Sequence, residues 1–108
     1  MSVQAIVADL EHLIENIRKG SDALYSAETD LAQKELDLDK AEALAFLDAE
    51  GSVAERQTRA RLSVAELRFE RDLSRAAVNR VRTKIKGLES ELMAQATISK
   101  LTAAEMRL

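Results

Sequence analysis

Apolar residues recur every seven positions along this chain, and that recurrence constrains the fold more than any other feature. In the first half one series runs without a gap, as Val3, Leu10, Ile17, Leu24, Leu31, Leu38 and Ala45. A second series lies three residues further along the chain. The second half contains both series again. One consists of Val64, Val78, Ile85 and Leu92, and the other of Ala60, Leu67, Val81 and Leu88. This a/d heptad pattern predicts a left-handed coiled coil.

Composition agrees with long helices. The 108 residues include no Pro, no Cys and only three Gly, together with one Tyr and two Phe. The lack of Pro favours uninterrupted helices, and the few aromatics disfavour a large globular core. Without Cys there are no disulfides and no thiolate chemistry. We therefore expect an all-α protein, a single domain over residues 1–108, built as an antiparallel helical hairpin or coiled coil.

Three interruptions of the pattern set the expected helix ends. Gly51 can end a helix in the left-handed conformation, and Ser52 to Glu55 has the spacing of a capping box. A weaker break lies at Gly20, and a third lies between residues 97 and 102. The prediction is a helix over about 3–49 with a break near 20–22, a turn at 50–52, a helix over about 53–96, and a short helix over about 102–107.

The charges predict a register for the hairpin. Residues 1–50 carry 4 basic and 12 acidic side chains, whereas residues 52–88 carry 10 basic and 4 acidic ones. Glutamates of the first helix and arginines of the second occupy the same heptad position, directly after d. With the turn at Gly51 and Ser52, the predicted ion pairs are Glu42–Arg61, Glu35–Arg68 and Glu28–Arg75. Each exposed pair contributes about 0.2–1 kcal/mol, so the pairs select register more than they stabilise.

The same register makes two predictions about the seam. It places Gly20 opposite Ile85, a fit of a small residue to a large one. It also places Lys34 and Arg71 in one core layer, next to Ser74. Because two like charges are costly to bury together, we expect that layer to be splayed towards solvent or paired with neighbouring acids.

A two-helix hairpin leaves many apolar residues uncovered, which predicts a homo-oligomer. Val7 and Ile14 widen the stripe near the N-terminus. The mixture of residue types at a and d leaves the number of copies open. The candidate interface residues are Leu36, Phe46, Leu47, Leu62, Phe69, Leu73, Ile98 and Leu101.

The sequence offers little for catalysis. His12 is the only histidine; with Asp9 and Glu15 it could form a weak surface metal site, although a solvated polar face is the simpler interpretation. No catalytic triad and no glycine-rich phosphate loop is present. We expect no enzyme, no cofactor, no metal and no small-molecule substrate. No apolar run approaches the roughly 18 residues of a membrane span, and the N-terminus lacks a basic signal region. The expected location is the cytoplasm, that of the host cell if the chain is phage-encoded.

The second half carries the candidate binding site. A run of cations there meets two more from the first helix in the predicted register and forms a candidate phosphate-binding patch. A weaker cluster lies beside the turn. The alternatives are a solvated face or a dock for an acidic protein. With no aromatic platform for bases, nucleic acid would bind through phosphates, with little sequence preference and high salt sensitivity. The patch comprises Arg18, Lys19, Arg80, Arg82, Lys84 and Lys86, and the weaker cluster Arg56 and Arg59.

The sequence resembles small coiled-coil proteins encoded in phage genomes beside recombination genes, and in particular the family of UvsY-like recombination mediators. The resemblance covers about residues 22–108. It rests on Tyr25-Ser26, the acidic and alanine-rich helix after it, Ala45-Phe46-Leu47-Asp48 with Gly51 just beyond, and the long helix that follows. It implies a ring-like homo-oligomer that binds single-stranded DNA and helps to load a recombinase. The family's basic residues before its Leu-Asp pair correspond here to Leu44 and Phe46, which moves any DNA contact to the second helix.

Two functional hypotheses follow. In the first, the chain is an oligomeric accessory protein of recombination that binds single-stranded DNA. In the second, it is a non-catalytic protein-interaction module, such as a scaffold, an assembly factor or a phage inhibitor of a host system, that binds no nucleic acid.

Overall fold

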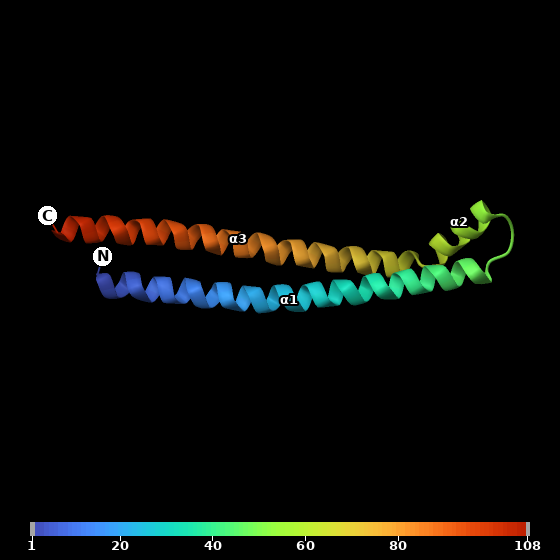
Figure 1. Cartoon of the computed structure of the whole chain (residues 1–108), viewed down its shortest axis with the longest axis horizontal. Helices are drawn as coiled ribbons and strands as arrows, with labels where there is room; N and C mark the ends of the chain where they lie inside the picture. Colours follow the sequence, from blue (N-terminus) through green and yellow to red (C-terminus); the bar gives the residue numbers. More distant parts are fainter. Residues whose placement is uncertain (1, 108) are drawn as a thin grey trace. The chain divides into compact units, whose positions relative to one another are not determined.

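The computed structural model describes residues 2–107, which are all-α, as the heptads predict. In this part of the chain the helices are α1 (Val3–Asp48), α2 (Val53–Ser63) and α3 (Ala65–Arg107), and there is no strand (Figure 1). The chain forms two compact units. Unit 1 consists of Met1–Leu24 with Arg80–Leu108, and unit 2 of Tyr25–Asn79. In each unit a stretch of α1 pairs with an antiparallel stretch of α3, so the predicted fold class is confirmed.

The expected break near residues 20–22 is wrong, because α1 continues without interruption through Gly20. Gly20 lies in unit 1 against Ile85, where a Cβ atom would approach Ile85 Cγ1 to 2.9 Å. The predicted pairing of these two residues is therefore confirmed. The glycine serves a close approach of side chain to backbone across the seam, and does not end a helix.

The predicted turn is present in unit 2. α1 ends at Asp48, Gly51 has a φ of 113°, and α2 starts at Val53. Ser52 is the N-cap of α2, and its Oγ accepts a hydrogen bond of 3.2 Å from the Glu55 backbone N–H. This bond satisfies one of the free donors at the start of the helix, as expected for the first half of a capping box.

The helix expected over residues 53–96 is interrupted at Val64, which separates α2 from α3. Val64 has φ −110° and ψ 17°, and its N–H donates to Leu62 O instead of continuing the α-helical pattern. Ser63 Oγ donates to Ala60 O at 2.9 Å, a local bond that competes with the helical ladder. Val64 is buried, so the apolar period passes through a residue at which the helix itself stops.

The expected separate helix at 102–107 is also absent as such, since α3 continues through this region to Arg107. Thr97 Oγ1 donates to Met93 O at 3.1 Å, four residues earlier. The hydroxyl of Thr97, at the start of the expected break, is therefore accommodated within the helix. Thr102 likewise lies inside α3 and caps nothing.

Each unit has a narrow core made from the a/d residues. In unit 1 the buried side chains are Ile6 and Leu13, and in unit 2 they include Leu38, Val64 and Val78. Ser74 is also buried in unit 2. A seam of this width covers one stripe of each helix, and the outer faces remain exposed.

Candidate binding surfaces

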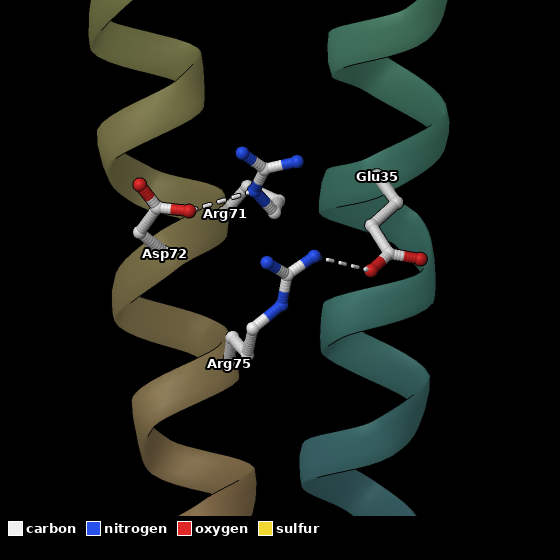
Figure 2. A network of polar contacts seen from close by, with 4 residues as sticks. All are labelled: Glu35, Arg71, Asp72 and Arg75. Carbon is white, nitrogen blue, oxygen red and sulfur yellow. Dashed lines mark hydrogen bonds and ion pairs between the residues drawn. The ribbon is translucent and has the colours of Figure 1, made fainter.

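Ion pairs join the two long helices of unit 2, but with partners different from those predicted. Arg68 Nη2 lies 3.5 Å from Glu42 Oε1. Figure 2 shows the second pair, in which Arg75 Nη2 lies 3.4 Å from Glu35 Oε1. Each glutamate thus pairs with the arginine one heptad beyond the predicted one. The predicted pairs Glu42–Arg61 and Glu35–Arg68 are corrected accordingly, and the predicted pair Glu28–Arg75 stays a prediction. Arg61 lines the same groove as Glu42, and Glu28 has an interaction of its own.

The direction of helical side chains explains the correction. Each Cα–Cβ bond leans towards the N-terminus of its own helix. Across an antiparallel pair, the side chains of Glu35 and Arg75 therefore lean towards each other, whereas those of Glu35 and Arg68 would lean apart. The prediction matched heptad positions correctly but ignored this lean. The backbone register itself was right, as the contact of Gly20 with Ile85 shows.

The charged layer of unit 2 is paired with acids, which was one of the two expected arrangements. Lys34 Nζ lies 4.0 Å from Glu70 Oε2. Arg71 Nε donates to Asp72 Oδ1 at 2.8 Å, as Figure 2 shows. The neighbouring Ser74 donates from Oγ to an oxygen of Asp30 at 2.8 Å, across the seam. These contacts explain how polar residues occupy a/d positions here without an unpaired charge in the core.

Arg56 and Arg59, the weaker basic cluster, form hydrogen bonds with backbone carbonyls near the turn. Arg56 donates to Phe46 O from both Nε and Nη2, at 3.2 and 3.0 Å, and its guanidinium lies 4.3 Å from the centre of the Phe46 ring. Arg59 Nη1 donates to Glu50 O at 3.0 Å. α1 has no basic residue in its own last turn, so Arg56 serves a free carbonyl at its C-terminal end. Arg59 binds a carbonyl of the turn that follows α1. Both arginines thus have structural contacts at the turn, and their role at nucleic acid stays a prediction.

The larger cationic patch lies in unit 1, and helical geometry divides it into two groups. Residues four apart share a helix face, so Arg80 and Lys84 lie on one side of α3 and Arg82 and Lys86 on another. All four are exposed. On α1, Arg18 pairs with Glu15 at 3.3 Å, and Arg82 has an interaction of its own. The cations of α3 that were predicted as part of one patch are therefore divided between two sides of that helix, and their binding role stays a prediction.

One of these groups borders a groove. Lys19 from α1 and Lys84 from α3 line a groove of about 380 Å³ together with Asn16 and the Gly20–Ile85 contact. The remaining lining residues are small or apolar, and no carboxylate belongs to the lining. Arg80 lies one helical turn before Lys84 on the same side. This group, Lys19, Arg80 and Lys84, is called the cationic groove below.

The predicted interface residues are mostly exposed, as expected for uncovered apolar surface. In unit 2, Leu62 on α2 and Phe69 and Leu73 on α3 are 72%, 64% and 55% exposed. Leu36 and Leu47 are also exposed there, whereas Phe46 is half-buried beneath Arg56. In unit 1, Ile98 and Leu101 are exposed.

The sequence interpretation passed over a second groove in unit 1. This groove measures about 190 Å³, lies between the start of α1 and the end of α3, and is lined by residues that include Val7, Ser99 and Ala103. Ser99 Oγ and Gln95 Oε1 are buried and have no hydrogen-bond partner. The sequence did contain a signal for this groove, at the heptad position directly after d. In unit 2 that position holds glutamates and arginines, whereas beside this groove it holds Val7, Ile14, Ala96 and Ala103.

The described residues contain neither a metal-binding cluster nor a membrane-spanning helix. Within residues 2–107 no group of three or more His, Cys, Asp or Glu side chains is placed to hold a metal ion. In the same part of the chain no helix has the length and apolar character needed to cross a bilayer. Comparison with protein-family models, with curated proteins and with solved structures finds no match to this chain.

Proposed function

We propose that the chain is a non-catalytic coiled-coil accessory protein that binds single-stranded DNA through its phosphates. The observation that carries the proposal is the cationic groove of unit 1, where Lys19 and Lys84 from two helices border one groove whose lining contains no carboxylate. Arg80 extends this surface by one turn along α3. Helping a recombinase to load on such DNA is the role implied by the resemblance to UvsY-like mediators, and it belongs to this proposal.

The chemistry of the groove limits how DNA would be bound. Lys and Arg contact phosphate oxygens and carry no base specificity. No aromatic side chain lines the groove, so there is no platform on which bases could stack. The proposed binding is therefore independent of sequence. It also releases counterions, so affinity must fall as salt rises.

The test is fluorescence anisotropy of a labelled oligo-dT strand titrated with the protein at about 50 and 200 mM salt. With three phosphate contacts on a single strand, affinity is expected to fall about 20-fold between these salt concentrations. A strand that fails to bind at the lower salt concentration would contradict the proposal.

Charge reversal then locates the binding surface. The double variant Lys19→Glu with Lys84→Glu should weaken binding at low salt by about tenfold or more, because two phosphate contacts are lost. The matched control is Lys86→Glu, which makes the same kind of charge change in the same stretch of α3 but on its other side. Equal losses for Lys86→Glu and for Lys84→Glu alone would mean that the groove is not the site.

A second candidate function is binding of a protein partner, favoured by the exposed apolar face of unit 2. Leu62, Phe69 and Leu73 all leave more than half of their surface to solvent, and exposed apolar groups of this size commonly mark interaction sites. The triple variant with glutamate at these positions should leave oligo-dT binding within about twofold if DNA is the ligand of unit 1. A chain that binds no DNA at low salt would leave this second candidate as the function.

A further inference from the structure

We infer that unit 1 carries the docking face for a second copy of this chain, at the groove between the start of α1 and the end of α3. The face is defined by the heptad position directly after d, which we call position e. In unit 1 this position is polar at Ser21, Arg82 and Glu89, but nearer the start of α1 and the end of α3 it holds Val7 and Ile14 on α1 and Ala96 and Ala103 on α3. Two hairpins joined through these faces form a four-helix bundle.

Exposure shows that the face is uncovered in a single copy. Val7 and Ile14 are 45% and 47% exposed, and Val3 at the end of the stripe is 50% exposed. The apolar stripe on α1 is thus three heptad positions wide (a, d and e), whereas a two-helix seam covers only a and d. A stripe of this width is typical of helices in bundles, where a third or fourth helix covers position e.

Polar atoms beneath the face indicate that packing there is incomplete. Ser99 lines the groove of about 190 Å³, and its hydroxyl oxygen is buried without a partner. Gln95, one turn earlier on α3, has its side-chain oxygen buried and without a partner as well. Buried polar groups are nearly always hydrogen-bonded in native folded proteins. A second copy would bring its own polar layer, Gln95 and Ser99, to this level of the bundle.

The shape of the face is complementary to itself. The α1 side presents branched side chains at Val7 and Ile14, and the α3 side presents the alanines at 96 and 103. A twofold axis parallel to the helices places the α1 side of each copy against the α3 side of the other. The branched residues of one copy then enter the spaces left by the alanines of its partner, which is the knobs-into-holes packing of a coiled coil.

The edges of the face carry opposite charges and select the same arrangement. Glu11 borders it on α1, where the next residue of the same edge, Arg18, is paired with Glu15. Lys100 and Arg107 border it on α3, and Glu11, Lys100 and Arg107 are exposed. An axis parallel to the helices brings the acidic edge of one copy to the basic edge of the other. An axis across the helices would bring Glu11 against Glu11 of the partner subunit, which is unfavourable. Charge and shape therefore identify the occupant as a second copy, with α1 facing the partner's α3.

Sedimentation equilibrium tests the inference. The wild-type chain should reach twice its monomer mass of 11.9 kDa with increasing concentration. The variant Val7→Glu with Ile14→Glu should weaken association by about 100-fold or more, since it buries two charges in the interface. The matched control, Leu62→Glu with Phe69→Glu, makes the same change on the outer face of unit 2 and should leave association within about threefold.

A second variant separates loss of the dimer from loss of folding. Val7→Glu with Ala103→Arg gives unit 1 the kind of ion pair that closes unit 2, so the chain should remain helical by circular dichroism but stay monomeric. A wild-type chain that is monomeric up to about 100 µM would overturn the inference, given that stable interfaces are usually tighter than this. So would a control variant that dissociates as readily as Val7→Glu with Ile14→Glu.

The orientation has its own test. Glu11→Lys should weaken association about threefold, and adding Lys100→Glu to the same chain should restore it, because each edge then meets its opposite in the partner. If Glu11→Lys leaves association unchanged instead, like charges meet there both before and after the change, so the acidic edges face each other and the proposed axis is wrong. None of these readouts involves DNA, so they stand or fall separately from the oligo-dT measurements.

Discussion

Heptad position e is occupied differently in the two units of this protein. In unit 2 it holds Glu35 and Glu42, which pair with Arg75 and Arg68 across the seam. In unit 1, towards the start of α1, it holds Val7 and Ile14, which are apolar and nearly half exposed. The backbone pairing is of the same kind in both. The flanking residues therefore decide whether a two-helix seam is bordered by ion pairs or offers an apolar face to a further helix.

The largest expected effect comes from the cores of the two units. Leu38→Ala in unit 2 removes a side chain that is 3% exposed, and should lower the free energy of unfolding by about 3 kcal/mol. Leu13→Ala in unit 1, at 6% exposed, makes the same truncation beneath the proposed docking face. Urea unfolding at two protein concentrations measures the free energy of unfolding of both variants.

The concentration dependence sharpens the comparison between these two variants. If unit 1 is completed by a second copy, the chain's stability rises with concentration by mass action. Leu13→Ala should reduce that dependence, because it disturbs the packing under the interface, and Leu38→Ala should preserve it. The same dependence in both variants would mean that the two cores do not differ in the way we infer.

The turn end of unit 2 provides the next largest effect. Arg56 makes two hydrogen bonds to Phe46 O and covers its ring, so Arg56→Ala should destabilise the chain by about 1–2 kcal/mol. Arg59→Ala, the matched control, removes a single exposed bond to Glu50 O and should cost less, about 0.5–1 kcal/mol. Thermal unfolding followed by circular dichroism compares them. Equal small effects would show that the turn is not held by Arg56.

Two glycines in unit 1 distinguish close packing from a mere lack of helix propensity. At Gly87 an added Cβ meets nothing within 4 Å, so Gly87→Ala should stabilise the helix by about 1 kcal/mol. At Gly20 the same atom would meet Ile85 Cγ1 at 2.9 Å, and the strain should offset most or all of that gain. Urea unfolding of both variants gives the difference. A full gain at Gly20 would mean that the seam relaxes freely there.

The fold could be predicted from the sequence because its determinants are local and periodic. The heptads gave the helices and their antiparallel pairing, and Gly51 with Ser52 gave the turn, since a left-handed glycine and a capping hydroxyl act within a few residues. The interruption at Val64 was missed because an apolar a residue satisfies the period whether or not the helix continues. Gly20 was mistaken for a break because its role depends on Ile85, which is distant in sequence.

The candidate site was predictable only in part, for a related reason. Composition identified the cations of residues 80–86, but which of them share a side depends on the helical angle, and this separated Lys84 from Lys86. Arg56 and Arg59 looked free in the sequence because their partners are backbone carbonyls, Phe46 O and Glu50 O, which no side-chain pattern reveals. The unpaired hydroxyl of Ser99 became visible only with the packing around it.

The smallest expected effect tests the ion pairs of unit 2. A double-mutant cycle on Glu35 and Arg75, with each replaced by glutamine, should give a coupling energy of about 0.2–1 kcal/mol, as for other partly exposed pairs. The same cycle on Glu35 and Arg68 should give a coupling near zero, because the two side chains lean apart along antiparallel helices. The measurement is urea unfolding at low salt, where screening is weakest. A larger coupling for Arg68 than for Arg75 would restore the register based on heptad position alone. It would also remove the side-chain lean as the reason why Glu42 selects Arg68 over Arg61.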